Sequence, residues 1–491
     1  MHTLIHTRCA RAHTCIIAQR YKLNPKCEIL CLVFVTLGRN GGLFGRFANY
    51  KKRCIFVFPK PKNNVKQLAL HPAWSYSAVL YEMNVRQLTP EGTLDAARRH
   101  LAFLARMGVD AIWLMPIYPI GRINRKGSLG SYYSVRDYVA VNEELGSMAD
   151  LDAFVEEAHR LGMKVILDWV ANHTARDARW LTEHPDWYEW ENGEPKIPCD
   201  WTDTAKLDYA NHAVWEAQVE AMRFWVEEHA IDGFRCDMAM LVPFEFWDYV
   251  TAELRQTKPD LFFLAEAEET RHFERGAFDA HYGWRLHHLM NNLAQGDCRT
   301  TQLRDYLYND GFPREAMRLS FTSNHDENSW SGTEFTRMGD ARELMTVLSF
   351  VAPQSLPLIY TGQEVGYNHV FAFFDKDPIP AIQQNAATTF YRRLIALKHN
   401  NPALQAGEKG GAMNDIRNNA EDCLMVLVRE VEGNRVVAVM NLSPYTIQAE
   451  YNTGIYAGDY IDFTTNSPTT LPDHVSEVMA PWAYKILTCK G

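Results

Sequence analysis

The chain has 491 residues, a length typical of about three domains, and is 47% hydrophobic and 22% charged. This composition is globular and excludes a coiled coil or a largely disordered chain. The formal charge of −10 argues against nucleic acid as a partner. The longest apolar run, residues 29–37, is less than half the ~20 residues of a membrane-spanning helix, so no membrane span is predicted.

Residues 1–66 differ from the rest of the chain in charge. They contain thirteen Lys and Arg residues and one acid, Glu28, so the segment carries +12 and the remainder −22. Because 28 residues precede the apolar run, a signal peptide is disfavoured. We therefore expect an atypical basic N-terminal extension with no part in the chemistry, and a cytoplasmic protein. Zinc binding is a weaker alternative, since no C-x-x-C pair is present; it would involve Cys9, His13, Cys15, Cys27 and Cys31.

From residue 71 onward, short apolar runs alternate with stretches of helical periodicity. Being apolar on both faces, the runs are typical of parallel strands covered by helices. The eight runs are residues 78–85, 111–117, 164–170, 233–237, 261–267, 277–284, 318–322 and 356–361.

The segments between these runs predict amphipathic helices. Apolar residues at helical spacing fill residues 94–104, 151–161 and 215–226, and Ser147 with Asp150 forms a capping-box pattern before the second of them. Eight strand–helix units predict a (β/α)₈ TIM barrel of the α/β class over residues 71–400.

Two further segments are expected. Residues 174–211, after the third strand, are too long and polar for a simple loop and predict a short inserted domain over the barrel mouth. Residues 405–491 contain strand-like runs at 424–429, 435–441, 446–451 and 483–487, separated by turn-forming residues. They predict a C-terminal antiparallel β-sandwich domain.

Polar residues cluster at the ends of the predicted strands, where the active site of a TIM barrel is found. Solvated loop charges would explain any one of them, but explain the whole set poorly, because each interrupts or directly follows an apolar run. They are Asp168, Asn172, His173, Arg235, Asp237, Glu266, Asn324, His325, Asp326, Gln363 and Glu364.

Asp237 and Glu266 end neighbouring strands, which in a sheet lie ~4.8 Å apart. This separation suits the ~5–5.5 Å between the two carboxyl groups of a retaining glycosidase. We expect Arg235 to hold Asp237 ionised, and apolar neighbours to raise the pKa of Glu266.

Four motifs resemble, in order, the signature regions of the α-amylase family (glycoside hydrolase family 13), and the similarity covers about residues 75–491. The motifs are Asp168-Trp-Val-Ala-Asn172-His173, Asp232-Gly-Phe-Arg235-Cys-Asp237, Leu264-Ala-Glu266 and Phe321-Thr-Ser-Asn324-His325-Asp326.

The resemblance implies roles for individual residues. Asp237 would be the nucleophile, Glu266 the general acid/base, and Asp326 the carboxylate that binds sugar hydroxyls. The expected substrate-binding residues, which include the tyrosine that would stack on the sugar, are Tyr133, Asp168, His173, Arg235 and His325.

One departure concerns calcium. Many members of the family have Lys-His three and four residues after the nucleophile, where this chain has Met240 and Leu241. Asn172 matches a calcium-ligating position, but is equally compatible with a buried hydrogen-bonding side chain. We expect no required cofactor and no metal site, although Ca²⁺ binding stays possible.

These observations favour a retaining hydrolase of α-glucosidic bonds, with α-1,4-linked starch or maltodextrin as its substrate. An α-glucan transferase is the enzymatic alternative, in which a sugar hydroxyl replaces water. A catalytically inactive amylase-like binding protein is disfavoured, because all three carboxylates are present.

Overall fold

The structure is a computed structural model that describes the backbone of residues 14–24 and 27–36, and residues 71–489 in full. The chain divides into two units, residues 1–68 and residues 69–491.

In the first unit, strand β1 (Thr14–Asn24) pairs in antiparallel fashion with strand β2 (Cys27–Thr36). The side chains of the alternative zinc site lie outside the described residues; they are Cys9, His13, Cys15, Cys27 and Cys31.

The second unit contains a closed barrel of eight parallel strands, so the predicted fold class is confirmed. Sequential strands are neighbours all the way round, and β14 closes the barrel on β3. The strands are β3 (Leu80–Met83), β4 (Ala111–Leu114), β5 (Lys164–Trp169), β10 (Gly233–Cys236), β11 (Phe262–Ala265), β12 (Ala280–Tyr282), β13 (Met317–Ser320) and β14 (Ser355–Tyr360).

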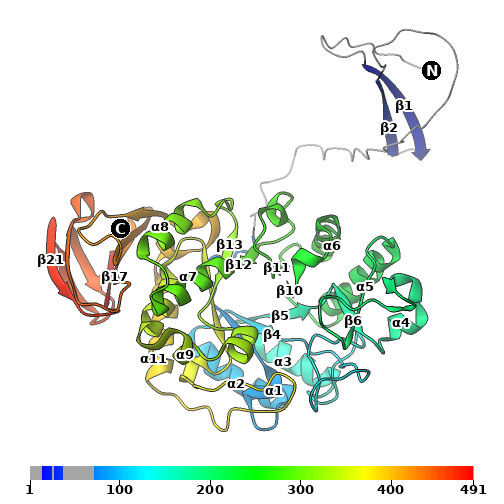
Figure 1. Cartoon of the computed structure of the whole chain (residues 1–491), viewed down its shortest axis with the longest axis horizontal. Coiled ribbons are helices and arrows are strands. Elements are labelled where there is room, and N and C mark those ends of the chain that lie inside the picture. The colour runs from blue at the N-terminus through cyan, green and yellow to red at the C-terminus, as the bar shows by residue number, and fades with distance from the viewer. Residues whose placement is uncertain (1–13, 25–26, 37–70, 490–491) are drawn as a thin grey trace. The chain divides into compact units, whose positions relative to one another are not determined.

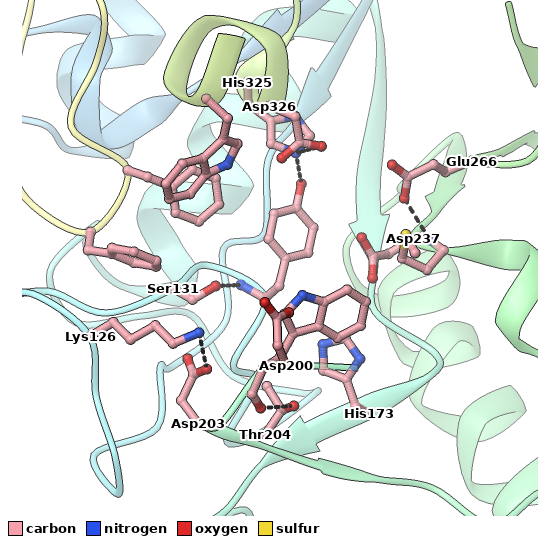
Figure 2. Close-up of a pocket in the computed structure, with 16 residues that line it drawn as sticks. Lys126, Ser131, His173, Asp200, Asp203, Thr204, Asp237, Glu266, His325 and Asp326 are labelled. Carbon is pink, nitrogen blue, oxygen red and sulfur yellow. Dashed lines mark hydrogen bonds and ion pairs between the residues drawn. The ribbon is translucent and has the colours of Figure 1, made fainter. Parts of the chain in front are cut away.

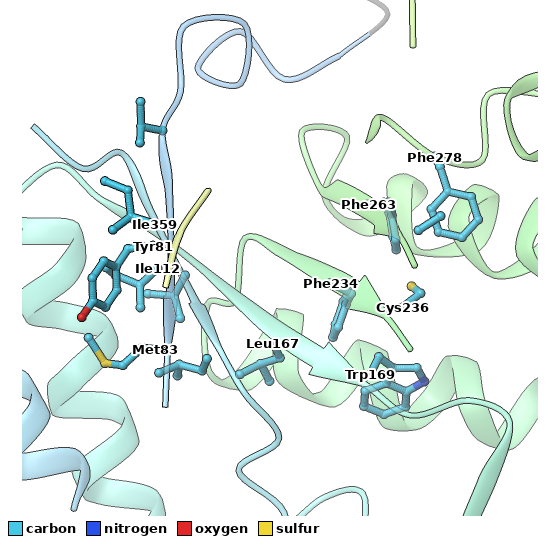
Figure 3. Packing of buried hydrophobic residues seen from close by; sticks show 14 of the residues in the cluster. Tyr81, Met83, Ile112, Leu167, Trp169, Phe234, Cys236, Phe263, Phe278 and Ile359 are labelled. Carbon is cyan, nitrogen blue, oxygen red and sulfur yellow. The ribbon is translucent and has the colours of Figure 1, made fainter. Parts of the chain in front are cut away.

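Alternate residues of each barrel strand enter two different cores. Leu80, Trp113 and Phe262 belong to the cluster inside the barrel. Their strand neighbours Tyr81 and Ile112 belong to the larger cluster between strands and helices, part of which Figure 3 shows. Burial on both faces explains why these strands are apolar runs without polar alternation.

Helices surround the barrel (Figure 1). Thr93 caps α2, and Ser147 with Asp150 forms the expected capping box of α3, so both helices begin where the sequence predicts. Within the described residues, no helix has the length and apolar character that a membrane crossing demands. The α-helices of the barrel are α1 (Val85–Leu88), α2 (Leu94–Met107), α3 (Met148–Arg160), α5 (His212–Glu228), α6 (Phe244–Thr257), α7 (Trp284–Gln295), α8 (Thr300–Asn309), α9 (Glu334–Met338), α10 (Arg342–Val351) and α11 (Ala386–Asn400).

The segment between β5 and α5 has small sheets of its own. Strand β6 (His173–Ala175) pairs with β9 (Thr204–Lys206), and β7 (Trp190–Glu191) pairs with β8 (Glu194–Pro195). A short helix, α4 (Arg179–Glu183), lies between these pairs in the chain. Because β6 begins four residues after β5 ends, this inserted segment starts directly at the carboxyl end of the barrel.

The C-terminal region is antiparallel, as predicted, and consists of a six-stranded sheet and a separate pair, β18 with β21. Four of its strands correspond to the predicted runs. Strands β15, β19, β20 and β21 were not predicted, because exposed polar residues and Pro468 break their apolar pattern. The strands are β15 (Ala412–Asp415), β16 (Leu424–Val431), β17 (Asn434–Asn441), β18 (Ile447–Asn452), β19 (Gly458–Asp462), β20 (Ser467–Leu471), β21 (His474–Met479) and β22 (Tyr484–Cys489).

Candidate active site

A cavity of about 440 Å³ lies at the carboxyl end of the barrel strands (Figure 2). Six of the eight predicted site residues line it: Tyr133, His173, Asp237, Glu266, His325 and Asp326. The other two, Asp168 and Arg235, have fully buried side chains behind this lining. They contact the lining residues, so the structure places them where they can position those residues; their predicted contact with substrate stays a prediction.

One guanidinium organises the carboxylates of the site. Arg235 Nη1 donates hydrogen bonds to Asp168 Oδ1 and Asp237 Oδ1, both at 2.9 Å. Its Nη2 lies 2.8 Å from Glu266 Oε2. Three carboxylates therefore share a single buried positive charge, an arrangement that places more negative than positive charge in a low-dielectric site.

This sharing changes the expected electrostatics. Burial raises the pKa of Asp237 well above its usual range, with Arg235 acting against that rise and the charge of Glu266 adding to it. Burial also raises the pKa of Glu266, again opposed by Arg235. Arg235 therefore acts on Asp237 in the predicted direction, because it lowers that pKa, but its charge is divided among three acids and burial outweighs it.

The surroundings of Glu266 are also more polar than the sequence predicts. Besides its ion pair with Arg235, Glu266 Oε2 accepts a hydrogen bond from the backbone N–H of Met238 at 2.7 Å. Met238 has φ 42° and ψ 45°, a left-handed conformation that is strained for a residue with a side chain. At this turn the backbone N–H after Asp237 faces Glu266, a contact that nothing in the residue type Met could have revealed.

A hydrogen-bonded chain holds the other side of the cavity. His325 Nδ1 lies 2.5 Å from Glu82 Oε1, and His325 Nε2 lies 2.8 Å from the hydroxyl of Tyr133. Tyr133 in turn donates to Asp168 Oδ2 at 3.1 Å. Burial acts to lower the pKa of His325, but the carboxylates of Asp326 and Glu82 outweigh it and raise that pKa to about 9.

Sequence reasoning missed Glu82, although a signal existed. Glu82 is fully buried in the middle of the apolar first run, where an acid is expected only with a partner. The protonated imidazole of His325 is that partner. The contact with Glu82 holds the His325 ring in place, and the ring in turn holds the hydroxyl of Tyr133.

Asn172 lies where the family resemblance suggests a calcium ligand, but its oxygen already has a cation. Lys206 Nζ donates to Asn172 Oδ1 at 2.7 Å. Asn172 Nδ2 lies 3.1 Å from His173 Nδ1, and burial, together with the charge of Lys206, lowers the pKa of His173 to about 3. An ammonium group within hydrogen-bond distance would repel Ca²⁺, so these residues do not fit the ion. Across the described part of the chain, no cluster of three or more acidic, His or Cys side chains has metal-binding geometry.

Aromatic side chains complete the lining, and the sequence did not single them out. Trp201 of the inserted segment lies 5.0 Å from His173 between ring centroids. Trp330, after β13, lies 5.2 Å from Phe373, which follows β14 and stacks on Tyr133. Flat apolar faces beside polar groups suit a sugar ring, which has both kinds of surface.

The fold and the site together define a TIM-barrel protein with a cluster of acids at the carboxyl end of its strands. The family model described as "Alpha amylase, catalytic domain" matches residues 46–403, so the chain belongs to the α-amylase family. The match begins within the basic segment and ends just after α11.

Relatives include hydrolases and transferases by name. "Alpha-amylase MalA" of Haloarcula japonica is 29% identical over 410 residues, which cover 79% of this chain and 59% of the relative. An "Alpha-1,4-glucan:maltose-1-phosphate maltosyltransferase" of Cereibacter sphaeroides is 34% identical over 228 residues, 41% of this chain and 37% of the relative. The chain thus spans less than two thirds of the length of these relatives.

Solved structures agree with the fold. A maltogenic α-amylase, AmyB, from Thermotoga neapolitana superposes with a TM-score of 0.76 and 26% identity, covering 84% of this chain and 99% of that one. An α-amylase from Lactobacillus plantarum gives a TM-score of 0.74 and 29% identity, covering 85% and 100%.

Proposed function

We propose that this protein is a retaining glycoside hydrolase that cleaves α-1,4-glucosidic bonds in starch or maltodextrins. The observation that carries the proposal is the register of two neighbouring strands. Cys236 of β10 pairs with Ala265 of β11, so the next residues, Asp237 and Glu266, are side by side at one end of the barrel. Adjacent strands lie ~4.8 Å apart, close to the ~5–5.5 Å that a retaining pair of carboxyl groups uses.

The mechanism follows from two carboxyl groups that face one cavity. Asp237 attacks the anomeric carbon while Glu266 gives a proton to the leaving oxygen; Glu266 then removes a proton from water, which displaces Asp237. Burial and crowding of like charges raise the pKa values of both Asp237 and Glu266. The raised values favour one proton shared by this pair, which Glu266 can give to the leaving oxygen in the first step. Asp326, whose partly exposed side chain lines the same cavity, binds sugar hydroxyls.

The anomer released first tests the mechanism. Two inversions give net retention, so proton NMR in the first seconds should detect the α-anomer. A β-anomer would contradict the roles of both residues.

Two variants separate those roles. Asp237→Asn should abolish turnover of every substrate while leaving substrate binding largely in place. Glu266→Gln should be equally poor on starch, yet lose far less activity with α-glucosyl fluoride, whose leaving group needs little proton assistance. Equal losses of the Glu266→Gln variant on both substrates would contradict its role as the acid.

A second candidate is an α-glucan transferase, which the maltosyltransferase relatives favour. Hydrolase and transferase share the covalent intermediate and differ in whether water or a sugar hydroxyl attacks it. A time course with maltoheptaose distinguishes them, because only transfer produces chains longer than the substrate.

We also propose that turnover does not require calcium. The support is the Lys206 ammonium at Asn172, which supplies a positive charge within the protein itself. The cytoplasmic location and the absence of a nucleic-acid partner stay predictions from the sequence.

A further inference from the structure

Three segments that are distant in sequence join to form one wall of the cavity. The loop after β4 contacts the loop after β14, since Leu129 N–H donates to Phe374 O at 2.9 Å and Ser128 N–H donates to Asp375 Oδ1 at 2.7 Å. The same loop contacts the inserted segment through Asn124 Nδ2, which donates to Thr202 O at 3.0 Å. Hydrogen bonds on both sides make this wall continuous.

Lys126 lies where the three segments meet. Its ammonium is 3.2 Å from Asp203 Oδ1 and 5.8 Å from the ring centroid of Phe374. The next residue, Gly127, approaches so closely that an added Cβ would lie 2.5 Å from Phe374 Cβ. These contacts bring the loop after β4 directly against the segments on both sides of it.

Asp203 has an unused acceptor at this wall. Only 2% of the residue is exposed, its Oδ1 is paired with Lys126, and its Oδ2 has no hydrogen-bond partner among the described residues. Asp203 and Lys126 both line the cavity. A buried carboxylate oxygen without a partner is costly, and a sugar hydroxyl would satisfy it.

The position of this wall relative to Glu266 decides which end of the substrate it meets. Figure 2 shows Lys126 and Asp203 at the opposite end of the cavity from Glu266. Under the proposed function, Glu266 protonates the leaving oxygen, so the leaving part of the chain lies on its side. The part that becomes attached to Asp237 therefore extends toward Lys126 and Asp203.

We propose that Lys126 and Asp203 close the cavity around the non-reducing end of an α-glucan and bind its terminal hydroxyl groups, so that the enzyme releases short products from that chain end. This inference rests on the proposed function. It adds which end of the glucan chain is cleaved and a limit on the length of the glycone. The volume of about 440 Å³ accommodates a short glycone, and the wall prevents a longer one.

A blocked substrate tests the direction of attack. The probes are p-nitrophenyl α-maltoheptaoside and the same compound with a 4,6-O-ethylidene group on its non-reducing glucose. Chromatography of the products should show cleavage of the blocked compound at least about tenfold more slowly, because its end cannot reach Asp203. Equal rates would overturn the proposal, since an enzyme that cuts internally ignores the chain end.

Variants of the wall give a second measurement. Asp203→Asn should raise the KM for the unblocked compound about tenfold with little change in kcat, as expected when a charged hydrogen bond to substrate is lost. Lys126→Ala should raise the ratio of blocked to unblocked rates toward one. Lys196→Ala is the matched control, because Lys196 pairs with Glu189 on the same inserted segment outside the cavity lining. An unchanged ratio in folded Lys126→Ala would contradict the proposal.

Binding separates this inference from the proposed function. In Asp237→Asn, calorimetry with maltoheptaose and its ethylidene derivative should give at least about tenfold weaker binding of the blocked sugar. If neither chromogenic probe is hydrolysed by the wild type but this difference persists, hydrolysis is wrong and the closed end is upheld. Equal dissociation constants overturn the closed end whatever the turnover.

Discussion

The two ends of strand β10 carry opposite arrangements of charge. At the amino end, the carboxylate of Asp232 is surrounded by Lys258 at 2.9 Å, Lys164 at 3.2 Å and His159 at 2.6 Å. At the carboxyl end, the one guanidinium of Arg235 is shared by three carboxylates. One end has several donors for a single acid, and the other has several acids for a single donor.

The pKa values of the two ends differ accordingly. Burial acts to raise the pKa of Asp232, but hydrogen bonds from His159 and Lys258 outweigh it, so this pKa lies below its usual range. Burial raises the pKa of Asp237 and of Glu266 instead. Ionised Asp232 therefore stabilises the folded chain at neutral pH, whereas ionised Asp237 costs stability. The amino end of β10 therefore carries stabilising charge, whereas its carboxyl end, where the candidate active site lies, carries unfavourable charge.

The largest expected effect comes from the carboxyl end. Asp237→Asn should lower kcat by at least about 10⁴-fold, because the proposed nucleophile is lost. Its thermal midpoint at pH 7 should be at least that of the wild type, and any gain should vanish below the ordinary Asp pKa of about 3.9, where the acid is protonated in both states. Thermal unfolding across pH checks this; a marked fall in the midpoint at pH 7 would show that the crowded acids stabilise the fold.

Asp232→Asn should give the reverse result. It should destabilise the chain by about 3 kcal/mol, because two ammonium groups lose their shared carboxylate, while kcat/KM stays unchanged in the folded variant. Since the folded pKa is depressed, this stabilisation is present above about pH 3.9 and fades as the pH falls below that value. Urea unfolding at several pH values measures it. The control is Asp260→Asn, at an exposed acid preceding β11, which should change neither the free energy of unfolding nor kcat/KM. An Asp232→Asn protein as stable as the wild type would contradict the contrast between the two ends of β10.

The inserted segment offers a third arrangement of charge to compare with the two ends of β10. Here the ammonium of Lys206 donates to an uncharged side chain, that of Asn172. Lys206→Met should destabilise the chain by about 1–3 kcal/mol, since Asn172 Oδ1 is left buried without a donor. Exhaustive chelation should leave the melting temperature and turnover of the wild type unchanged. Lys196→Met, on the same segment, is the matched control. A loss on chelation that added Ca²⁺ restores would contradict the proposed independence from calcium.

The smallest effect is expected from deletion of residues 1–66. Both ends of β10 and every residue of the candidate site lie within residues 71–489, so stability and kcat/KM should not change. A truncated protein that is well folded but inactive would show that the basic segment contributes to the site.

Sequence reasoning located most of the candidate site because parallel strands in sequential order bring their carboxyl ends to one edge. Asp168, Asp237 and Glu266 each end an apolar run, so their proximity follows from topology alone. Their electrostatics did not follow, because no pattern in the sequence says that Arg235 is shared three ways. The strained backbone of Met238 was equally hidden, since its conformation depends on the turn that follows β10.

Local patterns in the sequence by themselves determined the barrel, its helices and the order of the acids, because burial on both faces and helical periodicity leave a direct record in residue type. Tertiary structure alone decided the shape of the cavity. Lys126, Asp203 and Phe374 come from three loops far apart in the chain, and their contact depends on how those loops pack over the barrel mouth. Such contacts are set by the three-dimensional path of irregular backbone, which has no periodicity for a sequence to display.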